Sequence, residues 1–481
     1  MSCDICRRCA EKRNGGIFII FNATTFIIYN HMKYLLIIFL IISTAQAQYQ
    51  PTWESIDKRP VPAWFNEAKF GIFIHWGLYS VPSWAPTDKN MHVYSKYSEW
   101  YWHRYMRDTS AVGKAFRNYH HTTYGENFKY QDFANMFKAE LFKPEDWAGL
   151  FKASGARYVV LTSKHHEGFT LWPSQESWNW NSVDVGPHRD LAGDLIKAVK
   201  EKGLRMGYYY SLYEWFNPLY KADVNRYVNE HMLPQMKDLV NRYHPDVFWT
   251  DGEWDHPSDV WKSTEFLAWL YNESPVKDQV VVNDRWGKET RSKHGGIYTT
   301  EYDLVHQGKA GAIDHPWEEC RGIGNSFGYN RAENWDDYSS SEQLVHILID
   351  KCARGGNLLL DIGPAADGTI PAIMQQRLID MGQWLKVNGE AIYGTTSWKQ
   401  APKKENVFFT KKGNDIFVLC TKFPDKEIVV DNIGSFKTVS MLGYKGAVKA
   451  RVKGGKLVIT PPALTPANNP CQYAWAFKIG N

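Results

Sequence analysis

The chain has 481 residues, of which 44% are hydrophobic and 22% are charged, and its formal net charge is +4. This length predicts one large domain with a smaller one, or two to three domains. The small net charge gives no support for nucleic-acid binding, which needs a clustered basic face. The 21 Trp and 27 Tyr residues fit a large aromatic core, and they also fit a cleft whose rings lie against sugars.

The N-terminal region has the pattern of a secretory signal. A basic start at Met32 is followed by an apolar run over residues 35–42, which is too short to span a bilayer, and by a small-residue cleavage site ending at Ala47. We therefore expect residues 1–31 to be a non-native upstream extension and residues 32–47 to be the signal peptide. The alternative is a membrane anchor formed by this run together with the apolar residues before Met32, at 17–21 and 26–29.

The cysteines fall into two groups. Cys3, Cys6 and Cys9 precede the signal, and their spacing is only a weak indication of a metal site because no fourth ligand is near. The predicted mature chain keeps four cysteines, which permit up to two disulfides whose pairing the sequence does not give: Cys320, Cys352, Cys420 and Cys471.

Seven short apolar runs predict strands, and amphipathic stretches between them predict helices. The predicted strands are residues 70–75, 158–164, 204–211, 247–251, 280–285, 297–301 and 357–363. Helical spacing of apolar residues is clearest over residues 191–199, 224–243 and 341–354. Strands that alternate with helices indicate a parallel sheet, and seven or eight such units favour a (β/α)8-like TIM barrel. A doubly wound sheet is the alternative, although the glycine-rich turn of such folds is missing.

The sequence pattern changes near residue 395, where the alternation of strand-like and helical stretches ends. Short strand-like runs over residues 407–410, 415–420, 427–430 and 456–459 are separated by Gly and Lys turns. We therefore expect a catalytic α/β barrel over residues 48–395, followed by a C-terminal antiparallel β-sandwich over residues 396–481.

Six of the predicted barrel strands end on polar or aromatic groups. These groups occupy residues 75–76, 164–167, 209–211, 249–252, 283–286 and 301. In a barrel of this type the carboxyl ends of the strands carry the catalytic side chains. A solvent-exposed loop would rarely use His and Trp so often, so the pattern predicts a site at this end.

Two carboxylates at these strand ends suit the cleavage of a glycosidic bond. One carboxylate of such a pair attacks the anomeric carbon, and the other protonates the leaving oxygen and then activates water. Asp251 and Glu301 are the candidates. Either residue alone could be a helix cap or a surface acid, but the pair among aromatic strand ends favours catalysis.

His165 and His166 could be read as metal ligands. Adjacent residues of a strand point to opposite faces, so both could not easily hold one ion, and the His-Glu-x-x-His motif is missing. Hydrogen bonding of neutral imidazoles to sugar hydroxyls is favoured, and a buried core histidine is the alternative. We expect neither a metal nor another cofactor.

These strand ends, in this order, resemble glycoside hydrolase family 29, the retaining, exo-acting α-L-fucosidases. The resemblance covers roughly residues 53–393 and is carried by FGIFIHWG, KHHEGF, GYYYS, WTDG, NDRW and NLLLDIGP. The segment ECRGIGNSFGYN, residues 319–330, is similar to the bacterial branch of the family. The resemblance implies a catalytic barrel followed by a β-sandwich.

The resemblance also implies roles for individual residues. Asp251 matches the nucleophile, and Glu301 fits the acid/base, with Glu318 as its rival. Glu253 and Asp255 are interpreted as loop acids. The positions that match the fucose pocket, with Phe327 near the methyl group of the sugar, are His75, Glu99, Trp100, His165, His166, Tyr209, Trp249, Arg285 and Phe327.

The function implied is hydrolysis of terminal α-L-fucose from oligosaccharides or glycoconjugates through a covalent fucosyl-enzyme. The expected partner is a fucosylated glycan, with no nucleic acid and no membrane after signal cleavage, and a homo-oligomer is compatible with the sequence. The expected location is secreted or periplasmic, or lysosomal or extracellular in a eukaryote. The alternatives are an inactive fucose-binding protein, an α-L-galactosidase-type hydrolase and a metal-dependent hydrolase.

Overall fold

The computed structural model describes residues 49–303, 315–402, 404–433 and 436–480. The predicted upstream extension and signal peptide lie outside the described residues, and so do Cys3, Cys6 and Cys9. Residues Gln50–Asn481 form one compact unit, which holds every element described below. Among the helices of the described ranges, none combines the length and the apolar character needed to cross a bilayer.

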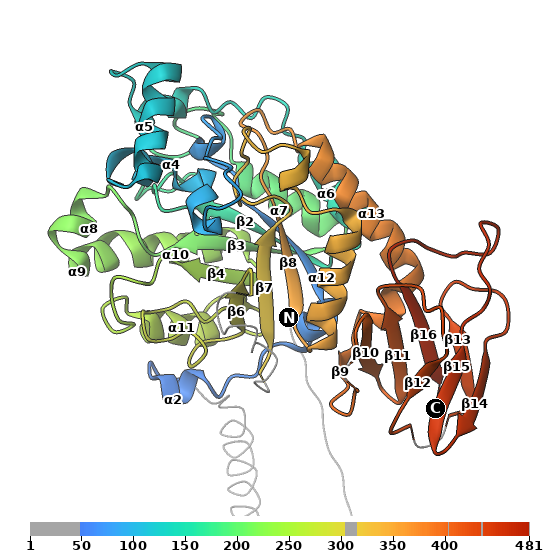
Figure 1. The fold of residues 1–481 in the computed structure, drawn as a ribbon. Helices are drawn as coiled ribbons and strands as arrows, with labels where there is room; N and C mark the ends of the chain where they lie inside the picture. The colour runs from blue at the N-terminus through green and yellow to red at the C-terminus, as the bar shows by residue number, and fades with distance from the viewer. Residues whose placement is uncertain (1–48, 304–314, 403, 434–435, 481) are drawn as a thin grey trace, which may run out of the picture. The chain divides into compact units, whose positions relative to one another are not determined.

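Eight parallel strands in the described part of the chain form one curled sheet (Figure 1). Their order in the sheet is β5-β4-β3-β2-β1-β8-β7-β6. The strands are β1 (Phe70–Ile74), β2 (Tyr158–Lys164), β3 (Arg205–Ser211), β4 (Val247–Asp251), β5 (Val281–Val282), β6 (Tyr298–Glu301), β7 (Trp317–Gly322) and β8 (Asn357–Ile362).

The strand order follows the chain around a barrel. A doubly wound sheet would reverse its strand order at a switch point, so that alternative is wrong. Strand pairing stops at β5 and β6, but backbone hydrogen bonds still join this seam, because Ile297 N donates to Val282 O at 2.8 Å and Gly296 N donates to Asn283 O at 3.1 Å. The predicted (β/α)8-like architecture is confirmed, with an irregular seam.

Helices follow most of the strands. α7 shows why they form, since Asp190 caps its first turn by accepting from Gly193 N at 2.9 Å, while Leu191, Leu195 and Val199 are buried on one face. The helices are α2 (Trp53–Ile56), α3 (Ala63–Ala68), α4 (Tyr101–Met106), α5 (Ala111–Tyr124), α6 (Pro144–Ala153), α7 (Leu191–Glu201), α8 (Pro218–Ala222), α9 (Val224–Tyr227), α10 (Leu233–Tyr243), α11 (Ser263–Asn272), α12 (Ser341–Ala353) and α13 (Ala372–Asn388).

Two barrel strands differ from the sequence expectation. β7 was not expected, because its sequence WEECRG has two carboxylates and an arginine where a buried strand normally has apolar residues. β5 has only two residues, because the chain beyond it turns away. There the Asn283 side chain, not a strand neighbour, accepts from Thr250 N at 3.2 Å and from Thr250 Oγ1 at 2.9 Å.

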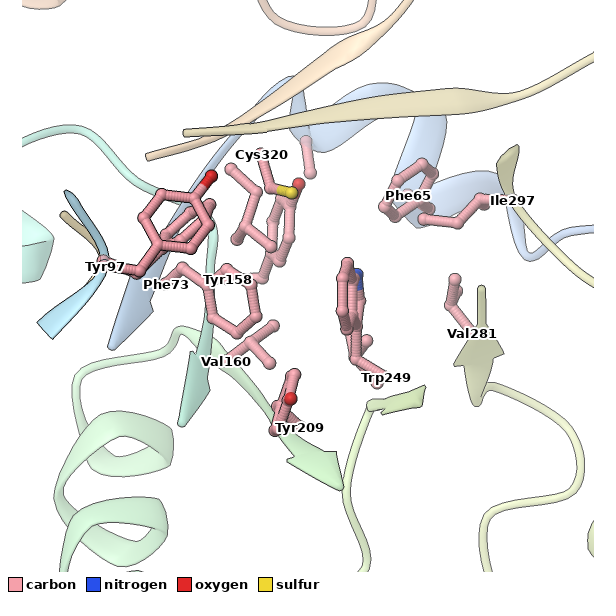
Figure 2. Close-up of a cluster of buried hydrophobic side chains, with 14 residues drawn as sticks. Phe65, Phe73, Tyr97, Tyr158, Val160, Tyr209, Trp249, Val281, Ile297 and Cys320 are labelled. Carbon is pink, nitrogen blue, oxygen red and sulfur yellow. The ribbon is translucent and has the colours of Figure 1, made fainter. Parts of the chain in front are cut away.

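The barrel interior is an aromatic and aliphatic cluster to which most strands contribute (Figure 2). Phe73 of β1 and Trp249 of β4 lie in this cluster. Side chains two residues apart on a strand point the same way, so His75 follows Phe73 and Asp251 follows Trp249 on the inner side. The packed core therefore continues directly into the polar groups at the carboxyl ends of the strands.

The C-terminal part contains two antiparallel sheets, as predicted for a β-sandwich. A five-stranded sheet and a three-stranded sheet share a core that includes Val418, Phe477, Val430 and Ile459. The strands are β9 (Thr396–Ser397), β10 (Val407–Lys412), β11 (Asp415–Cys420), β12 (Ile428–Val430), β13 (Thr438–Met441), β14 (Lys449–Lys453), β15 (Lys456–Thr460) and β16 (Trp475–Gly480). Of these, β9, β13, β14 and β16 were not expected.

The cysteines of the described chain are free thiols. Cys320, Cys352 and Cys420 are buried, and Cys471 is partly exposed. The disulfides that the cysteine count permitted are not formed in the structure.

Candidate active site

A cavity of about 590 Å³ opens at the carboxyl ends of the barrel strands. Every residue that the sequence placed in the pocket lines it, and the rival Glu318 does not. The lining residues are Phe73, His75, Tyr94, Tyr97, Glu99, Trp100, Arg104, His165, His166, Tyr209, Trp249, Asp251, Glu253, Trp254, Arg285, Lys288, Arg291, Glu301, Cys320 and Phe327.

Asp251 is the last residue of β4 and is only 8% exposed. Its Oδ1 accepts from Arg285 Nη1 at 2.8 Å and lies 3.7 Å from Arg291 Nη2, and its Oδ2 accepts from the Tyr209 hydroxyl at 3.0 Å. Burial alone would raise the pKa of Asp251, but Arg285 and Arg291 outweigh it and hold that pKa well below the usual range. The carboxylate is therefore ionised at neutral pH. Gly252 follows with φ +75°, which turns the chain sharply out of the strand.

Arg285 lies between the two candidate catalytic carboxylates. Its Nη2 is 3.5 Å from Glu301 Oε2, and its Nε donates to Thr299 Oγ1 at 3.0 Å. The guanidinium also stacks over the Trp249 ring, 4.4 Å from its centroid. Only 3% of the Arg285 side chain is exposed, so this cation acts on both carboxylates through little intervening water.

Glu301 and Glu318 have different surroundings. Glu301 lines the cavity and its Oε1 accepts from the Tyr97 hydroxyl at 2.7 Å. Glu318 is buried behind the wall, where it accepts hydrogen bonds from the Tyr158 hydroxyl and from Trp249 Nε1. Burial raises the pKa of Glu318 to about 7. The geometry favours Glu301 as the carboxyl group that could reach a leaving oxygen.

His165 and His166 both line the cavity, which differs from the expectation of opposite faces. β2 ends at Lys164, so the two residues lie beyond the strand, and their ring centroids are 4.1 Å apart. His75 is the third histidine of the cavity, and its Nδ1 lies 2.7 Å from Oδ1 of the fully buried Asp361. Burial lowers the pKa of His75 and of His166 well below the usual value, so these rings are neutral at pH 7.

Glu99 anchors a loop that carries an aromatic wall of the cavity. Its Oε2 accepts from Gly328 N at 2.9 Å and from Ser326 Oγ at 3.2 Å. Between these two residues, Phe327 packs against His75 with 4.9 Å between ring centroids, and it is 6% exposed. Trp100, next to Glu99 in the chain, forms another part of the wall. The cavity thus combines carboxylates and imidazoles with one apolar side.

Sequence reasoning missed several cavity groups. Glu253, interpreted as a loop acid, is 1% exposed, and its Oε1 accepts from Arg291 Nε at 2.5 Å. Asp255 does behave as a loop acid, accepting from the Tyr220 hydroxyl at 2.8 Å at an exposed position. Tyr97 stands two residues before Glu99 in the chain and could have been found there.

Comparisons with known proteins match most of the chain to alpha-L-fucosidases. A family model described as Alpha-L-fucosidase matches residues 37–390, and one described as Alpha-L-fucosidase C-terminal domain matches residues 401–480. The chain is 43% identical to an alpha-L-fucosidase of Dictyostelium discoideum, over 93% of this chain and 99% of that protein. It is also 43% identical to the tissue alpha-L-fucosidase of Bos taurus, over 91% of this chain and 92% of that protein.

A solved structure gives the same relationship. The Thermotoga maritima alpha-fucosidase in complex with a mechanism-based inhibitor is 39% identical, with a TM-score of 0.75, and the match covers 90% of this chain and 100% of that chain. The relatives include both bacterial and eukaryotic proteins, so the assignment to a bacterial branch stays a prediction. With matching models for both parts and relatives above 40% identity over nearly the whole length, the chain belongs to the alpha-L-fucosidase family of glycoside hydrolases.

Proposed function

We propose that the chain releases terminal α-L-fucose from glycans by double displacement, with Asp251 as the nucleophile and Glu301 as the acid/base. Asp251 attacks C1 while Glu301 gives its proton to the glycosidic oxygen, and a covalent fucosyl-enzyme forms. Glu301 then removes a proton from water, which attacks C1 and frees Asp251. The observation that carries this proposal is that Arg285 contacts both carboxylates, at 2.8 Å and 3.5 Å.

Arg285 makes a closer contact with Asp251 than with Glu301. Its shorter contact goes to Asp251, which must be ionised to attack. Its longer contact goes to Glu301, which must carry a proton when the bond breaks. Retaining glycosidases hold such carboxyl groups only about 5 Å apart, and the bridging of both groups by one guanidinium is compatible with that spacing.

The walls of the cavity suit a deoxy sugar. His75, His165, His166 and Glu99 can exchange hydrogen bonds with ring hydroxyls. Phe327 offers an apolar surface for the C6 methyl group, where an α-L-galactoside would place a hydroxyl. This apolar wall favours fucosides over the galactoside alternative. The Thermotoga maritima relative has been solved in complex with fucose, which supports the same ligand here.

The location and partners of the chain also remain proposals. The predicted signal over residues 32–47 supports export, to an extracellular, periplasmic or lysosomal compartment. Relatives named tissue and plasma alpha-L-fucosidase support a role on glycans outside the cytosol. We expect a fucosylated glycan as the partner, without a cofactor.

Hydrolysis of an aryl α-L-fucoside followed by proton NMR tests this function. The first sugar released is expected to be α-L-fucose, which then mutarotates, and activity is expected to persist in excess chelator. Initial release of β-L-fucose would contradict double displacement, and loss of activity with chelator would favour a metal-dependent hydrolase. A panel of fucosylated oligosaccharides in the same assay gives the linkage preference.

A further inference from the structure

His166 has a hydrogen-bond partner behind it that lies outside the cavity. Its Nδ1 lies 2.6 Å from Oγ of Ser211, the last residue of β3, and Ser211 is fully buried. The Ser211 hydroxyl itself donates to the carbonyl oxygen of Tyr213 at 2.6 Å. The three groups form a short series of hydrogen bonds that ends on the backbone.

The protons in this series of hydrogen bonds, from His166 through Ser211 to the Tyr213 carbonyl, can be assigned. A serine hydroxyl has one proton, and that of Ser211 is used on the Tyr213 carbonyl, which can only accept. In the contact with His166, Ser211 Oγ must therefore be the acceptor, and Nδ1 of His166 must carry a proton. A neutral imidazole has one N–H, so Nε2 of His166 presents a bare lone pair.

The surroundings of His166 keep the ring neutral. Three tryptophan rings lie around it, with centroid distances of 5.6 Å to Trp100, 5.1 Å to Trp215 and 5.3 Å to Trp254. His165 and Lys164 add positive potential, and Asp251, whose Oδ2 lies 3.7 Å from Nε2, acts in the opposite direction. A protonated imidazole would be poorly solvated in this setting.

Nε2 of His166 faces the nucleophile. It lies 3.7 Å from Asp251 Oδ2, and both atoms are hydrogen-bond acceptors. Two acceptors at this distance do not bind each other, but a hydroxyl placed beside both could donate to one of them. When Asp251 is positioned to attack C1, the nearest sugar hydroxyl is the one on C2, the neighbouring carbon.

We propose that Ser211 is a positioning residue of the fucosidase reaction, which fixes the Nδ1–H tautomer of His166 so that Nε2 accepts a hydrogen bond from the C2 hydroxyl of fucose. This inference rests on the function proposed above and adds to it a residue that does not line the cavity. Ser211 acts only through His166. Without it, the imidazole is free to place its N–H on Nε2 and to donate to Asp251, which would compete with the sugar and weaken the nucleophile.

A binding experiment with three sugars tests which partner is the donor. L-Fucose, 2-deoxy-L-fucose and 2-deoxy-2-fluoro-L-fucose are used as competitive inhibitors of the wild-type chain. Fluorine accepts but cannot donate a hydrogen bond, so both analogues are expected to bind about tenfold or more weakly than fucose. If the fluoro analogue bound as well as fucose, Nε2 of His166 would be a donor and the proposal would be wrong.

The variant Ser211→Ala tests the positioning role. Its inhibition constant for L-fucose is expected to rise about tenfold, while that for 2-deoxy-L-fucose stays close to wild type, because the lost contact is specific to the C2 hydroxyl. Equal weakening of both sugars would indicate a general structural defect and would contradict the proposal. Ser163→Ala is the matched control. Ser163 is also a buried strand serine, and it donates to the carbonyl oxygen of Tyr209 at 2.7 Å. Among the described residues, it has no hydrogen bond with a histidine ring.

A spectroscopic measurement separates this inference from the proposed reaction. In protein labelled with ¹⁵N-histidine, the His166 signals, assigned by their loss in His166→Asn, are expected to show the Nδ1–H form in the wild type and a shift toward the Nε2–H form in Ser211→Ala. An Nε2–H form in the wild type would overturn the inference even if fucose is released normally. Absence of any fucoside hydrolysis would instead overturn the proposed function.

Discussion

Arg285 donates from Nη1 to Oδ1 of Asp251 at 2.8 Å, and both side chains are almost completely buried. A buried ion pair is costly to break, because removal of one partner leaves an uncompensated charge. The pair therefore keeps Asp251 ionised, and it also links the end of β4 to the chain beyond β5. Changes to Arg285 itself would mix these effects, so a neighbouring cation gives a cleaner test.

Arg291→Ala is expected to move the acidic limb of kcat/KM toward neutral pH. Arg291 lies 3.7 Å from Asp251 Oδ1 and helps to lower the pKa of Asp251, so its loss lets that pKa rise toward its ordinary value. A nucleophile with a higher pKa becomes protonated, and thus inactive, at a higher pH. The measurement is the pH profile of kcat/KM with an aryl fucoside. Lys288→Ala removes an exposed cation of the same cavity and is expected to leave the acidic limb of kcat/KM in place. If the acidic limb did not move in Arg291→Ala, Arg291 would not help to lower the pKa of Asp251.

Glu301→Ala is expected to affect substrates according to their leaving groups. Natural fucosides need protonation of the leaving oxygen and should lose about 10² to 10⁴ in kcat/KM, whereas an activated aryl fucoside should lose much less. The two substrates are compared side by side. Glu318→Gln serves as the comparison, because Glu318 lies behind the wall and should give a similar, smaller loss for both substrates. If leaving-group dependence appeared in Glu318→Gln instead, Glu318 would be the acid/base.

Phe327→Ala is expected to relax the selection against a hydroxyl at C6. Phe327 lines the cavity and is 6% exposed, so its removal leaves room for the additional group of an α-L-galactoside. The ratio of kcat/KM for the fucoside over the galactoside should fall about tenfold or more. Trp254→Phe changes a more exposed aromatic residue of the same cavity and should leave this ratio nearly unchanged. An unchanged ratio in Phe327→Ala would place the methyl group elsewhere.

The contribution of Glu318 to the stability of the chain is expected to fall as the pH rises from about 4.5 to about 7. Burial raises the pKa of Glu318 to about 7 in the folded state, from a usual value of 4.5, so the unfolded chain releases this proton first. The free energy of unfolding then falls with pH by up to about 1.4 kcal/mol per pH unit for this one group. Glu318→Gln cannot ionise, so the stability of this variant relative to the wild type is expected to rise across this pH range.

Thermal unfolding of the two proteins between pH 5 and pH 8 provides the comparison. Glu319 also has a pKa raised to about 7 by burial, and its contribution is present in both proteins. Glu427→Gln, at an exposed ion pair with Arg451, should not alter the slope in this range. Equal slopes for the wild type and Glu318→Gln would show that Glu318 is ionised in the folded protein.

The sequence predicted the parts of the site that follow regular apolar strands. His75, Asp251 and Glu301 each end a strand-like run, and alternation places them on the inner side of the barrel. β7 was not predicted because Glu318 and Glu319 lie in it. The burial of Glu318 depends on Tyr158, which comes from a distant part of the chain. Contacts between distant segments leave no local pattern.

Residues that act on the site through contacts between distant segments are equally hard to predict from the sequence. Asp361 could have been suspected, because NLLLD places it two residues after Leu359 on an inner-facing strand. Arg291 and Ser211 carried no such signal, since Arg291 lies in an irregular loop and Ser211 is an ordinary polar residue at the end of a strand. Their contacts with Asp251 and His166 arise only when the barrel brings the strand ends together.

We propose that Asp251 forms the covalent fucosyl-enzyme, and the decisive measurement is the activity of the variant Asp251→Ala with and without added azide. The variant is expected to lose about 10⁴ or more in activity on an aryl fucoside, since it keeps the pocket but not the nucleophile. Azide should fill the vacated space, restore part of the turnover and give β-L-fucosyl azide, the product of a single inversion, as seen by NMR. Near wild-type hydrolysis by Asp251→Ala without azide, or an α-L-fucosyl azide product, would contradict the assignment.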